Sequence, residues 1–483
     1  MAVQTEKILR YFEQINAIPR CSKDEARLCS WLQQWARDRN LPFQVDAAGN
    51  LVIQVAAAPG HGHRPGVVLQ GHMDMVCEKN PQSKHDFRND PIVSRKDGDW
   101  LCAQGTTLGA DNGIALAYML ALADQPEMVH PPLELLFTVD EETGLNGAKA
   151  LQPGFISGRY LMNLDSEDEG ILTIGCAGGV DTEIRLTIRK EKIHPDARLM
   201  QVVVGGLRGG HSGIDIHRHR ANANKVLART LMRIRKEAAM GVVTMNGGCR
   251  KNAIPRDAQA LIWVNAHNEA LIIQAVAQMQ ATIRAEFAAS ETDLFIHCVP
   301  VSEPPAEASA LTQADTDQAI RLLLGLPHGV AGMSPDLEGL VETSSNVATV
   351  DIKDQRFCVV TSQRSAIMSR LEEITATIHA VAELAGATTD DRDAYPAWPP
   401  NPDSALLGLA QKCYHRLFGR EPVVQAMHAG LECAVIGNIY PEMEMISFGP
   451  TLCNPHSPDE RLYIPSIQKV WDFLVALLKA TCE

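Results

Sequence analysis

Imidazole and carboxylate side chains recur in this sequence just after short apolar stretches, and these are the groups that could do chemistry. Four motifs in the first half of the chain contain them, and the candidates are His72 and Asp74, Asp111, Glu141 and Glu142, and Asp165. Imidazole nitrogen and carboxylate oxygen are suitable ligands for zinc and similar divalent metals. The residue types therefore indicate a metal site held by nitrogen and oxygen atoms.

Each motif also has an ordinary interpretation when it is taken alone. A His-x-Asp pair in a loop is most often a surface turn, and the Asp-Asn-Gly sequence at 111–113 is most often a turn or a helix N-cap. Adjacent glutamates are usually solvated, and Asp165 stands in an acidic run. The metal site is favoured because all four ordinary interpretations would have to hold together within one region of the chain.

The elements that must position these residues form an alternation of strands and helices. The predicted elements are apolar strands over 67–69, 133–139 and 160–164, an apolar helix over 113–123 and a first helix that includes 8–15. Ser22 and Glu25 predict a capping box for a second helix. Near-continuous apolar strands between helices predict an α/β sheet covered on both faces. In such sheets functional side chains gather at the carboxyl ends of the strands, where His72, Glu141 and Asp165 stand.

The pattern of predicted strands and helices changes after about residue 179, and the first pattern returns near residue 400. Residues 197–287 predict a strand, a helix, two strands and a helix, and residues 294–385 repeat that order without residue identity. A proline-rich stretch at 395–402 predicts a return linker. The expected division is a discontinuous catalytic domain of residues 1–182 and 397–483 and an inserted α+β domain of residues 183–396.

Length and charge exclude several classes of function. A chain of 483 residues is long enough for two or three domains. Its 44 Lys and Arg against 58 Asp and Glu give a net charge of −14, which argues against nucleic acid or an anionic membrane as the main partner. The apolar stretch at 113–123 is too short to span a bilayer, and the charged N-terminus is unlike a signal peptide. We therefore expect a soluble, cytoplasmic protein.

The twelve cysteines are scattered singly, without a C-x-x-C pair. Several stand in or beside apolar strands, namely Cys77, Cys176, Cys298 and Cys358. Such cysteines are typical of reduced, small hydrophobic side chains in a cytosolic chain. We expect neither a disulfide framework nor a thiolate zinc site.

The amino-acid sequences of the motifs resemble those of a known family. The metal-site motifs, together with a C-terminal His456, are similar to the two-zinc peptidase superfamily of carboxypeptidase G, aminoacylases and carnosinases. Longer stretches resemble the bacterial aminoacyl-histidine dipeptidases, also called Xaa-His or beta-alanyl-histidine dipeptidases; they are Gly206-Leu-Arg-Gly-Gly-His-Ser-Gly213, Leu340-Val-Glu-Thr-Ser-Ser-Asn346, His428-Ala-Gly-Leu-Glu432 and Asn454-Pro-His-Ser-Pro-Asp-Glu460. The resemblance implies an α/β zinc-peptidase domain with a central mixed sheet between helices, interrupted by an α+β lid domain of two β-α-β-β-α units.

The same resemblance implies a set of metal ligands. It assigns one zinc ion to His72 and Asp165 and a second to Glu142 and His456, with Asp111 bridging the two. A bridging carboxylate suits two cations roughly 3.5–4 Å apart. Co²⁺ or Mn²⁺ would satisfy the same ligands.

Three further acidic residues receive roles beside these ligands. Asp74 is expected to accept the second imidazole N–H of His72 and to fix its tautomer. Glu141 is expected to be the general base that takes a proton from water and delivers it to the leaving amine. If residues 141 and 142 are extended, their side chains alternate and Glu141 points away from the ligand Glu142. Glu432 belongs to the matched motif with its role, structural or amine-binding, left open.

The resemblance also assigns residues that contact substrate. His211 matches a histidine of the lid that stabilises the oxyanion of the tetrahedral intermediate. Asn252 and Arg364 match residues that grip substrate, and a guanidinium suits the C-terminal carboxylate of a peptide. His428 and Gly430 belong to a segment that lines the substrate.

The function implied is hydrolysis of small dipeptides, notably Xaa-His or carnosine-like substrates, by a monomer or a homodimer. A related two-zinc amidase, either an N-acyl amino acid deacylase or a tripeptidase, is the alternative within the enzyme class. A metal-binding relative without activity is disfavoured because Glu141 and all five ligand candidates are present. The loop at 205–212 nearly spells a phosphate-binding loop, but His211 replaces the lysine that such loops require.

Overall fold

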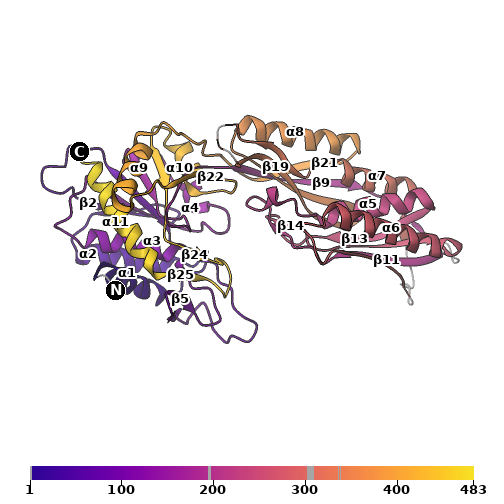
Figure 1. Cartoon of the computed structure of the whole chain (residues 1–483), viewed down its shortest axis with the longest axis horizontal. Helices are drawn as coiled ribbons and strands as arrows, with labels where there is room; N and C mark the ends of the chain where they lie inside the picture. The colour runs from indigo at the N-terminus through magenta and orange to yellow at the C-terminus, as the bar shows by residue number, and fades with distance from the viewer. Residues whose placement is uncertain (1–2, 194–196, 302–308, 336, 338) are drawn as a thin grey trace. The chain divides into compact units, whose positions relative to one another are not determined.

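The computed structural model of the chain describes residues 3–193, 197–301, 309–335, 337 and 339–483, and it divides into two compact units (Figure 1). Unit 1 comprises Met1–Cys176, Trp398–Ala426 and Leu431–Glu483, and unit 2 comprises Ala177–Ala397 and Met427–Gly430. These boundaries lie within a few residues of 182 and 396. The segment 427–430, which the sequence assigned to the catalytic domain, groups with unit 2 instead.

A mixed eight-stranded sheet forms the middle of unit 1. Strand β3 pairs in parallel with both β6 and β7, and β7 pairs in parallel with β23, whereas β1, β2 and β6 pair in antiparallel fashion. In order across the sheet the strands are β1 (Phe43–Val45), β2 (Leu51–Val55), β6 (Leu133–Thr138), β3 (Val67–His72), β7 (Tyr160–Asn163), β23 (Glu444–Ser447), β8 (Ile171–Cys176) and β22 (Val423–Met427). The three buried strands predicted from the apolar runs are confirmed as β3, β6 and β7.

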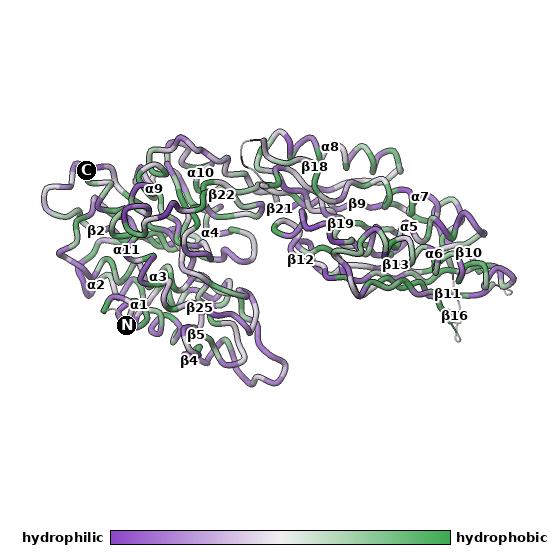
Figure 2. The backbone as a smooth tube through the Cα atoms, viewed as in Figure 1, coloured by the Kyte–Doolittle hydropathy of each residue, from purple (hydrophilic) through white to green (hydrophobic). Residues whose placement is uncertain are grey.

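Helices cover both faces of this sheet, which confirms the predicted α/β class. They are α1 (Val3–Asn16), α2 (Ala26–Asp38), α3 (Ala110–Ala123), α4 (Asn146–Ala150), α9 (Ala405–Phe418), α10 (Glu432–Ile439) and α11 (Ile464–Ala480). Val67 and Leu69 of β3 pack into one hydrophobic core with α1, α3, α9 and α11. Gln70 alternates to the opposite face and bonds to Glu432 of α10. The hydrophobic run of α3, almost wholly buried, can be followed in Figure 2.

The capping box predicted for α2 is wrong. Glu25 stands at the N-cap position but makes no side-chain capping bond, and its carboxylate accepts the N–H of Lys23 instead. The Ser22 hydroxyl donates to Asp74 Oδ2 at 2.8 Å. A buried carboxylate gains more from a hydroxyl donor than an exposed helix end does, so Ser22 serves Asp74 rather than the helix.

The expectation that all cysteines are reduced is also wrong. Cys21, after α1, and Cys77, after β3, form a disulfide with a Cα–Cα distance of 5.7 Å. The two segments lie side by side because Cys21 forms a parallel bridge with Met75. No other disulfide forms among the cysteines, all of which lie in described parts of the chain.

The described residues of unit 2 form one nine-stranded sheet with four α-helices. In order across the sheet the strands are β16 (Phe295–Pro300), β11 (Ala197–Gly205), β15 (Ala258–Asn265), β13 (Met240–Gly247), β19 (Val341–Lys353), β20 (Arg356–Ser365), β9 (Gly178–Thr187) and β21 (Thr388–Tyr395), with β18 (Gly329–Met333) beside β19. The helices are α5 (Ala223–Glu237), α6 (Glu269–Glu286), α7 (Gln313–Gly325) and α8 (Met368–Leu384). Figure 1 shows these helices gathered on one side of the sheet.

The predicted repeat is present in the first half of unit 2 as β11, α5, β13, β15 and α6. In the second half β17 (Ser309–Leu311), α7, β19, β20 and α8 follow the same order, with β18 added between α7 and β19. β16, which was expected to open the second repeat, pairs with β11 of the first instead. The two halves form a continuous sheet because β13 pairs with β19 at 246–247 and 350–351.

Three short sheets and two 3₁₀ turns complete the described part of the chain. A four-stranded sheet in unit 1 consists of β24 (Leu452–Cys453), β25 (Arg461–Tyr463), β5 (Trp100–Ala103) and β4 (Ser94–Asp97). In unit 2, β10 (Lys190–Lys192) pairs with β17, and β12 (Gly210–His211) pairs with β14 (Ala253–Ile254). Short 3₁₀ turns cover Ile216–Arg218 and Ala266–Asn268. Among the described residues, no helix is both long and apolar enough to cross a lipid bilayer.

Candidate metal centre

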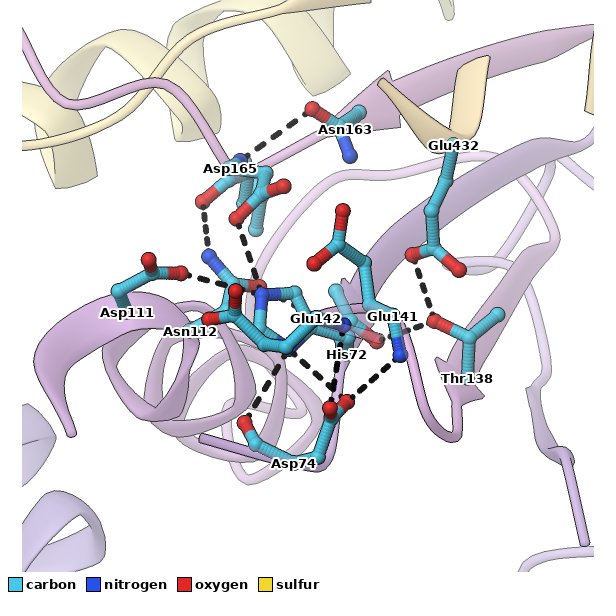
Figure 3. Close-up of polar contacts among 12 residues, drawn as sticks. His72, Asp74, Asp111, Asn112, Thr138, Glu141, Glu142, Asn163, Asp165 and Glu432 are labelled. Carbon is cyan, nitrogen blue, oxygen red and sulfur yellow. Dashed lines mark hydrogen bonds and ion pairs between the residues drawn. The ribbon is translucent and has the colours of Figure 1, made fainter. Parts of the chain in front are cut away.

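The candidate ligands of unit 1 stand where neighbouring strands end. His72 is the last residue of β3, Asp165 follows β7, and Glu142 follows β6, while Asp111 lies in the first turn of α3. Because β3, β6 and β7 are parallel, their carboxyl ends share one edge of the sheet. Figure 3 shows the side chains of these residues turned toward one another at that edge.

Asp111 faces two imidazoles, one on each carboxylate oxygen. Its Oδ1 lies 3.1 Å from Nε2 of His72, and its Oδ2 lies 2.9 Å from Nε2 of His456. His72 Nε2 also lies 3.5 Å from Asp165 Oδ1, and His456 Nε2 lies 3.1 Å from Glu142 Oε2. Two groups of ligand atoms result, each within 4.8 Å, and they share Asp111. The five residues expected as ligands are thus brought together, although His456 is separated from the others by most of the chain.

Electrostatics explain why this arrangement favours cations. Burial raises the pKa of Glu142 and of Asp165, and the neighbouring Asp111 carboxylate adds to both shifts. Burial opposes the charge of His456 too, but its hydrogen bonds to Asp111 and Glu142 raise the pKa of this imidazole to about 11. Buried carboxylates repel one another unless positive charge lies between them. Two imidazoles and three carboxylates are a donor set that fits a pair of divalent metal ions.

Asp74 links the His72 ring to the turn that carries the glutamates. Its Oδ1 and its carbonyl oxygen lie 3.3 and 3.1 Å from His72 Nδ1. Its carboxylate also accepts the backbone N–H groups of Glu141 at 3.0 Å and Glu142 at 3.2 Å. Burial alone would raise the pKa of Asp74, but the contacts with His72 lower it to about 2. An ionised Asp74 therefore holds the ring and the turn together.

The extended segment from which opposite directions were inferred for Glu141 and Glu142 is not present. The carbonyl of Glu141 accepts the N–H groups of Gly144 and Leu145, so the segment is a tight turn. Both carboxylates lie near His72, and the three residues form a further group that could hold a metal ion. Burial raises the pKa of the Glu141 carboxyl well above its ordinary value; His72 opposes the shift, and Glu142 adds to it.

Two residues that the sequence did not single out connect the strand ends. The Asn112 side chain accepts the backbone N–H of His72 at 3.2 Å and donates to the carbonyl of Leu164 at 3.1 Å. It therefore joins β3 and β7 next to the candidate ligands. Gln70 donates to Glu432 at 2.5 Å. Asn112 stood within a quoted motif, so the motif could have indicated its importance, whereas Gln70 gave no signal.

Glu432, whose role was left open, is fully buried in the wall of the site. The Thr138 hydroxyl donates to its Oε2 at 2.7 Å, and Gln70 donates to the same atom. Burial raises the pKa of Glu432 to about 7. With no exposed surface, the side chain is placed to support β3 and β6.

In unit 2, three of the expected substrate-binding residues surround Gly213. A Cβ on Gly213 would lie 3.2 Å from both Arg364 Cδ and His211 Cε1 and would collide with the carbonyl oxygen of His428. Burial lowers the pKa of His428 to about 3, and the positive charge of Arg364 adds to the shift. The Ser344 hydroxyl is 2.8 Å from His428 Nε2. His211, Arg364 and His428 therefore form one cluster.

Asn252 and Gly430 adjoin this cluster through neighbouring residues. The carbonyl of Asn252 accepts the N–H of Ser212, and β12 pairs with β14 next to it. Gly430 packs against the ring of Tyr395, where a Cβ would come within 2.9 Å. Arg364 Nη1 donates to the Tyr395 hydroxyl at 2.6 Å. The loop at 206–213 leads into β12 and a 3₁₀ turn rather than a helix, so it lacks the architecture of a phosphate-binding loop.

Comparison with known proteins identifies the family. A model of the peptidase family M20/M25/M40 matches residues 68–480. The chain is 40% identical over 468 residues to the cytosol non-specific dipeptidase of Escherichia coli K12. The alignment covers 97% of this chain and 96% of that protein. The chain belongs to peptidase family M20/M25/M40. The family resemblance seen in the motifs is thereby confirmed. This M20/M25/M40 peptidase is an enzyme that hydrolyses peptide bonds.

Solved structures agree with that assignment. The crystal structure of aminoacylhistidine dipeptidase from Vibrio alginolyticus matches the peptidase with a TM-score of 0.86 and 39% identity, over 98% of this chain and 96% of that one. Aminopeptidase PepT from Bacillus cereus matches with a TM-score of 0.57 and 16% identity, over 99% of both chains. At that identity the second match shows the shared fold alone.

Proposed function

We propose that this peptidase hydrolyses dipeptides, notably Xaa-His and carnosine-like dipeptides, with two zinc ions held in unit 1. The observation that carries the proposal is the pair of ligand groups that share Asp111, each with one imidazole. The names of its relatives support the substrate class, because one is a non-specific dipeptidase and another an aminoacylhistidine dipeptidase. A cytoplasmic location, which the name of the E. coli relative shares, is part of the proposal.

In the proposed mechanism His72 and Asp165 would hold one metal ion, Glu142 and His456 would hold the other, and Asp111 would contribute to both sites. When bound, the metal pair polarises the scissile carbonyl and lowers the pKa of the attacking water. Glu141 accepts the proton of that water on its carboxylate and delivers it to the leaving amine nitrogen. Asp74 keeps the His72 ring in the tautomer that presents Nε2.

The cluster of unit 2 is proposed to bind the substrate. Arg364 suits the C-terminal carboxylate because its buried Nε has no hydrogen-bond partner among the described residues, so the guanidinium has a donor to offer. His211 would stabilise the oxyanion of the tetrahedral intermediate. Asn252, His428 and Gly430 would line the space for the peptide.

A substrate panel tests the proposal directly. Hydrolysis of carnosine, Ala-His, a tripeptide and an N-acetyl amino acid is measured side by side on the zinc-loaded enzyme, together with the metal content per chain. We expect two metal ions per chain and the highest kcat/KM on the dipeptides. A preference for the acetylated amino acid would identify a deacylase, and a preference for the tripeptide would identify a tripeptidase. Either result would overturn the dipeptidase assignment.

A further inference from the structure

Glu460 holds the loop that leads into α3. It lies between β24 and β25, four residues after His456, and only 2% of its surface is exposed. Its two carboxylate oxygens accept four consecutive backbone N–H groups. These belong to Leu108 at 2.7 Å, Gly109 at 2.9 Å, Ala110 at 2.8 Å and Asp111 at 3.3 Å.

These bonds replace a cap that α3 lacks. The N-cap residue Gly109 has no side chain, and it adopts a left-handed conformation with φ +69°. The first N–H groups of a helix have no partners within the helix and carry partial positive charge. A carboxylate supplied from a segment about 350 residues later satisfies them. Glu460 therefore fixes the backbone from which the Asp111 side chain projects.

Arg20 holds the same loop through its carbonyl side. Its guanidinium is fully buried and donates to the carbonyl of Gly109 at 2.5 Å. The other arm donates to the carbonyls of Met73 and Asp74 at 3.0 Å each, in the segment that follows His72. A Cβ on Gly109 or on Gly113 would come within 2.6 or 2.5 Å of Arg20 Nη2. The two glycines of the 109–113 motif are therefore required to make room for this side chain.

We infer that Glu460 and Arg20 are positioning residues that hold the Asp111 carboxylate between the two imidazoles of the metal centre. Glu460 shares a hairpin loop with His456, so one side chain ties the loop of one imidazole to the backbone of Asp111. Arg20 ties that backbone to the segment of the other imidazole, His72. This inference rests on the proposed metal site. Within the described residues Glu460 and Arg20 belong to none of the groups that could hold a metal ion, so they act through other residues.

The test is Glu460→Gln, because the amide nitrogen would face backbone N–H groups that need an acceptor. The matched control is Glu134→Gln. Glu134 is also a buried carboxylate that accepts backbone N–H groups, from Ser157 at 2.8 Å and Gly158 at 2.9 Å, but it stands at the amino end of β6, away from the metal centre. Zinc affinity is measured by competition with a chromophoric chelator, and Co²⁺ spectra are recorded for each variant.

We expect Glu460→Gln to weaken zinc binding about 10–100-fold, as the loss of other supporting residues does, and to alter the Co²⁺ spectrum. Its KM for a dipeptide should stay unchanged at saturating metal. Glu134→Gln should lower thermal stability and leave both metal readouts unchanged. Equal zinc affinities in Glu460→Gln, Glu134→Gln and the unaltered enzyme would overturn the inference.

Two further outcomes are distinguishable from that one. If the unaltered enzyme binds fewer than two zinc ions, the proposed metal site fails, whatever the variants do. If Glu460→Gln does not fold, Arg20→Lys carries the test, since lysine keeps the charge but cannot bond to the carbonyls on both sides. Zinc affinity unchanged in Arg20→Lys would then overturn the inference, and a weakened affinity would support it.

Discussion

His456 in unit 1 and His428 in unit 2 are the same side chain under opposite electrostatic conditions. Asp111 and Glu142 hold the pKa of His456 at about 11, although burial opposes that shift. Burial lowers the pKa of His428 to about 3, and Arg364 adds to the effect. The surroundings of one imidazole attract positive charge, and those of the other exclude it.

The difference teaches what each region is suited to bind. In unit 1 the strand ends gather carboxylates around two imidazoles, which suits cations. In unit 2 the Arg364 side chain and the His211 ring lie beside Gly213, and both add positive charge near the His428 ring, so a carboxylate or a developing oxyanion would suit that cluster. The two clusters therefore differ in the sign of the charge that they favour, positive in unit 1 and negative in unit 2.

The largest effect is expected for Glu141→Gln, which separates a base from a ligand within unit 1. Because only proton transfer is removed, kcat should fall by roughly 10²–10⁴-fold while the zinc content stays at its original value. Steady-state rates and metal analysis of the same sample measure both. If the zinc content falls with kcat, Glu141 is a ligand and the contrast with Glu142 disappears.

A smaller effect is expected for Arg364→Met, which tests whether unit 2 binds an anion. Loss of a charge-assisted bond to the C-terminal carboxylate should raise KM for a dipeptide roughly 10–100-fold, in line with about 1.5–3 kcal/mol for such bonds. The C-terminally amidated dipeptide should show little change. Tyr395→Phe is the control, since it removes the partner of Arg364 Nη1 and keeps the guanidinium. An equal rise in KM for both substrates would contradict the proposal that Arg364 binds the C-terminal carboxylate.

The most gradual effect, spread over several pH units, is expected for His428→Gln, which tests the exclusion of positive charge. The folded pKa of about 3 lies below the ordinary value of 6.5, so the unfolded chain takes up a proton first as pH falls. The unaltered protein should lose stability between pH 6.5 and 3, by at most about 1.4 kcal/mol per pH unit. His428→Gln should lose less over that range. Urea unfolding at several pH values measures how steeply the free energy of unfolding falls with pH in each protein. The control is a substitution of an exposed histidine, His63→Gln. If His428→Gln and the unaltered protein lose stability equally steeply, His428 is not the histidine from which positive charge is excluded.

The elements that were predicted correctly are those that a local pattern of residues determines. Apolar runs identified β3, β6 and β7, and the position of His72 and Asp165 after such runs indicated one edge of a sheet. Parallel pairing then brings the ends together whatever the length of the connecting segments. The unit 2 cluster had no comparable signal, since Arg364 lies in the polar second half of β20 and its role came from the family resemblance.

Contacts between segments distant in the chain could not be predicted from spacing. Cys21 and Cys77 are 56 residues apart, and nothing local to either indicates the other. Ser22 followed by Glu25 satisfies the capping-box pattern, but the demand of the buried Asp74 for a donor is tertiary information. Glu460 stood in a quoted motif, yet its four N–H partners precede it by about 350 residues.

The chain passes between the two units four times, at 176–177, 397–398, 426–427 and 430–431. A recombinant fragment of residues 177–397 would therefore lack the peptide that presents the His428 carbonyl to Gly213 and Gly430 to Tyr395. It would also lose the acceptor for the N–H of Ala177, the carbonyl of Met427. Anyone who wishes to study unit 2 separately would have to graft those four residues back, for example through a short linker after residue 397.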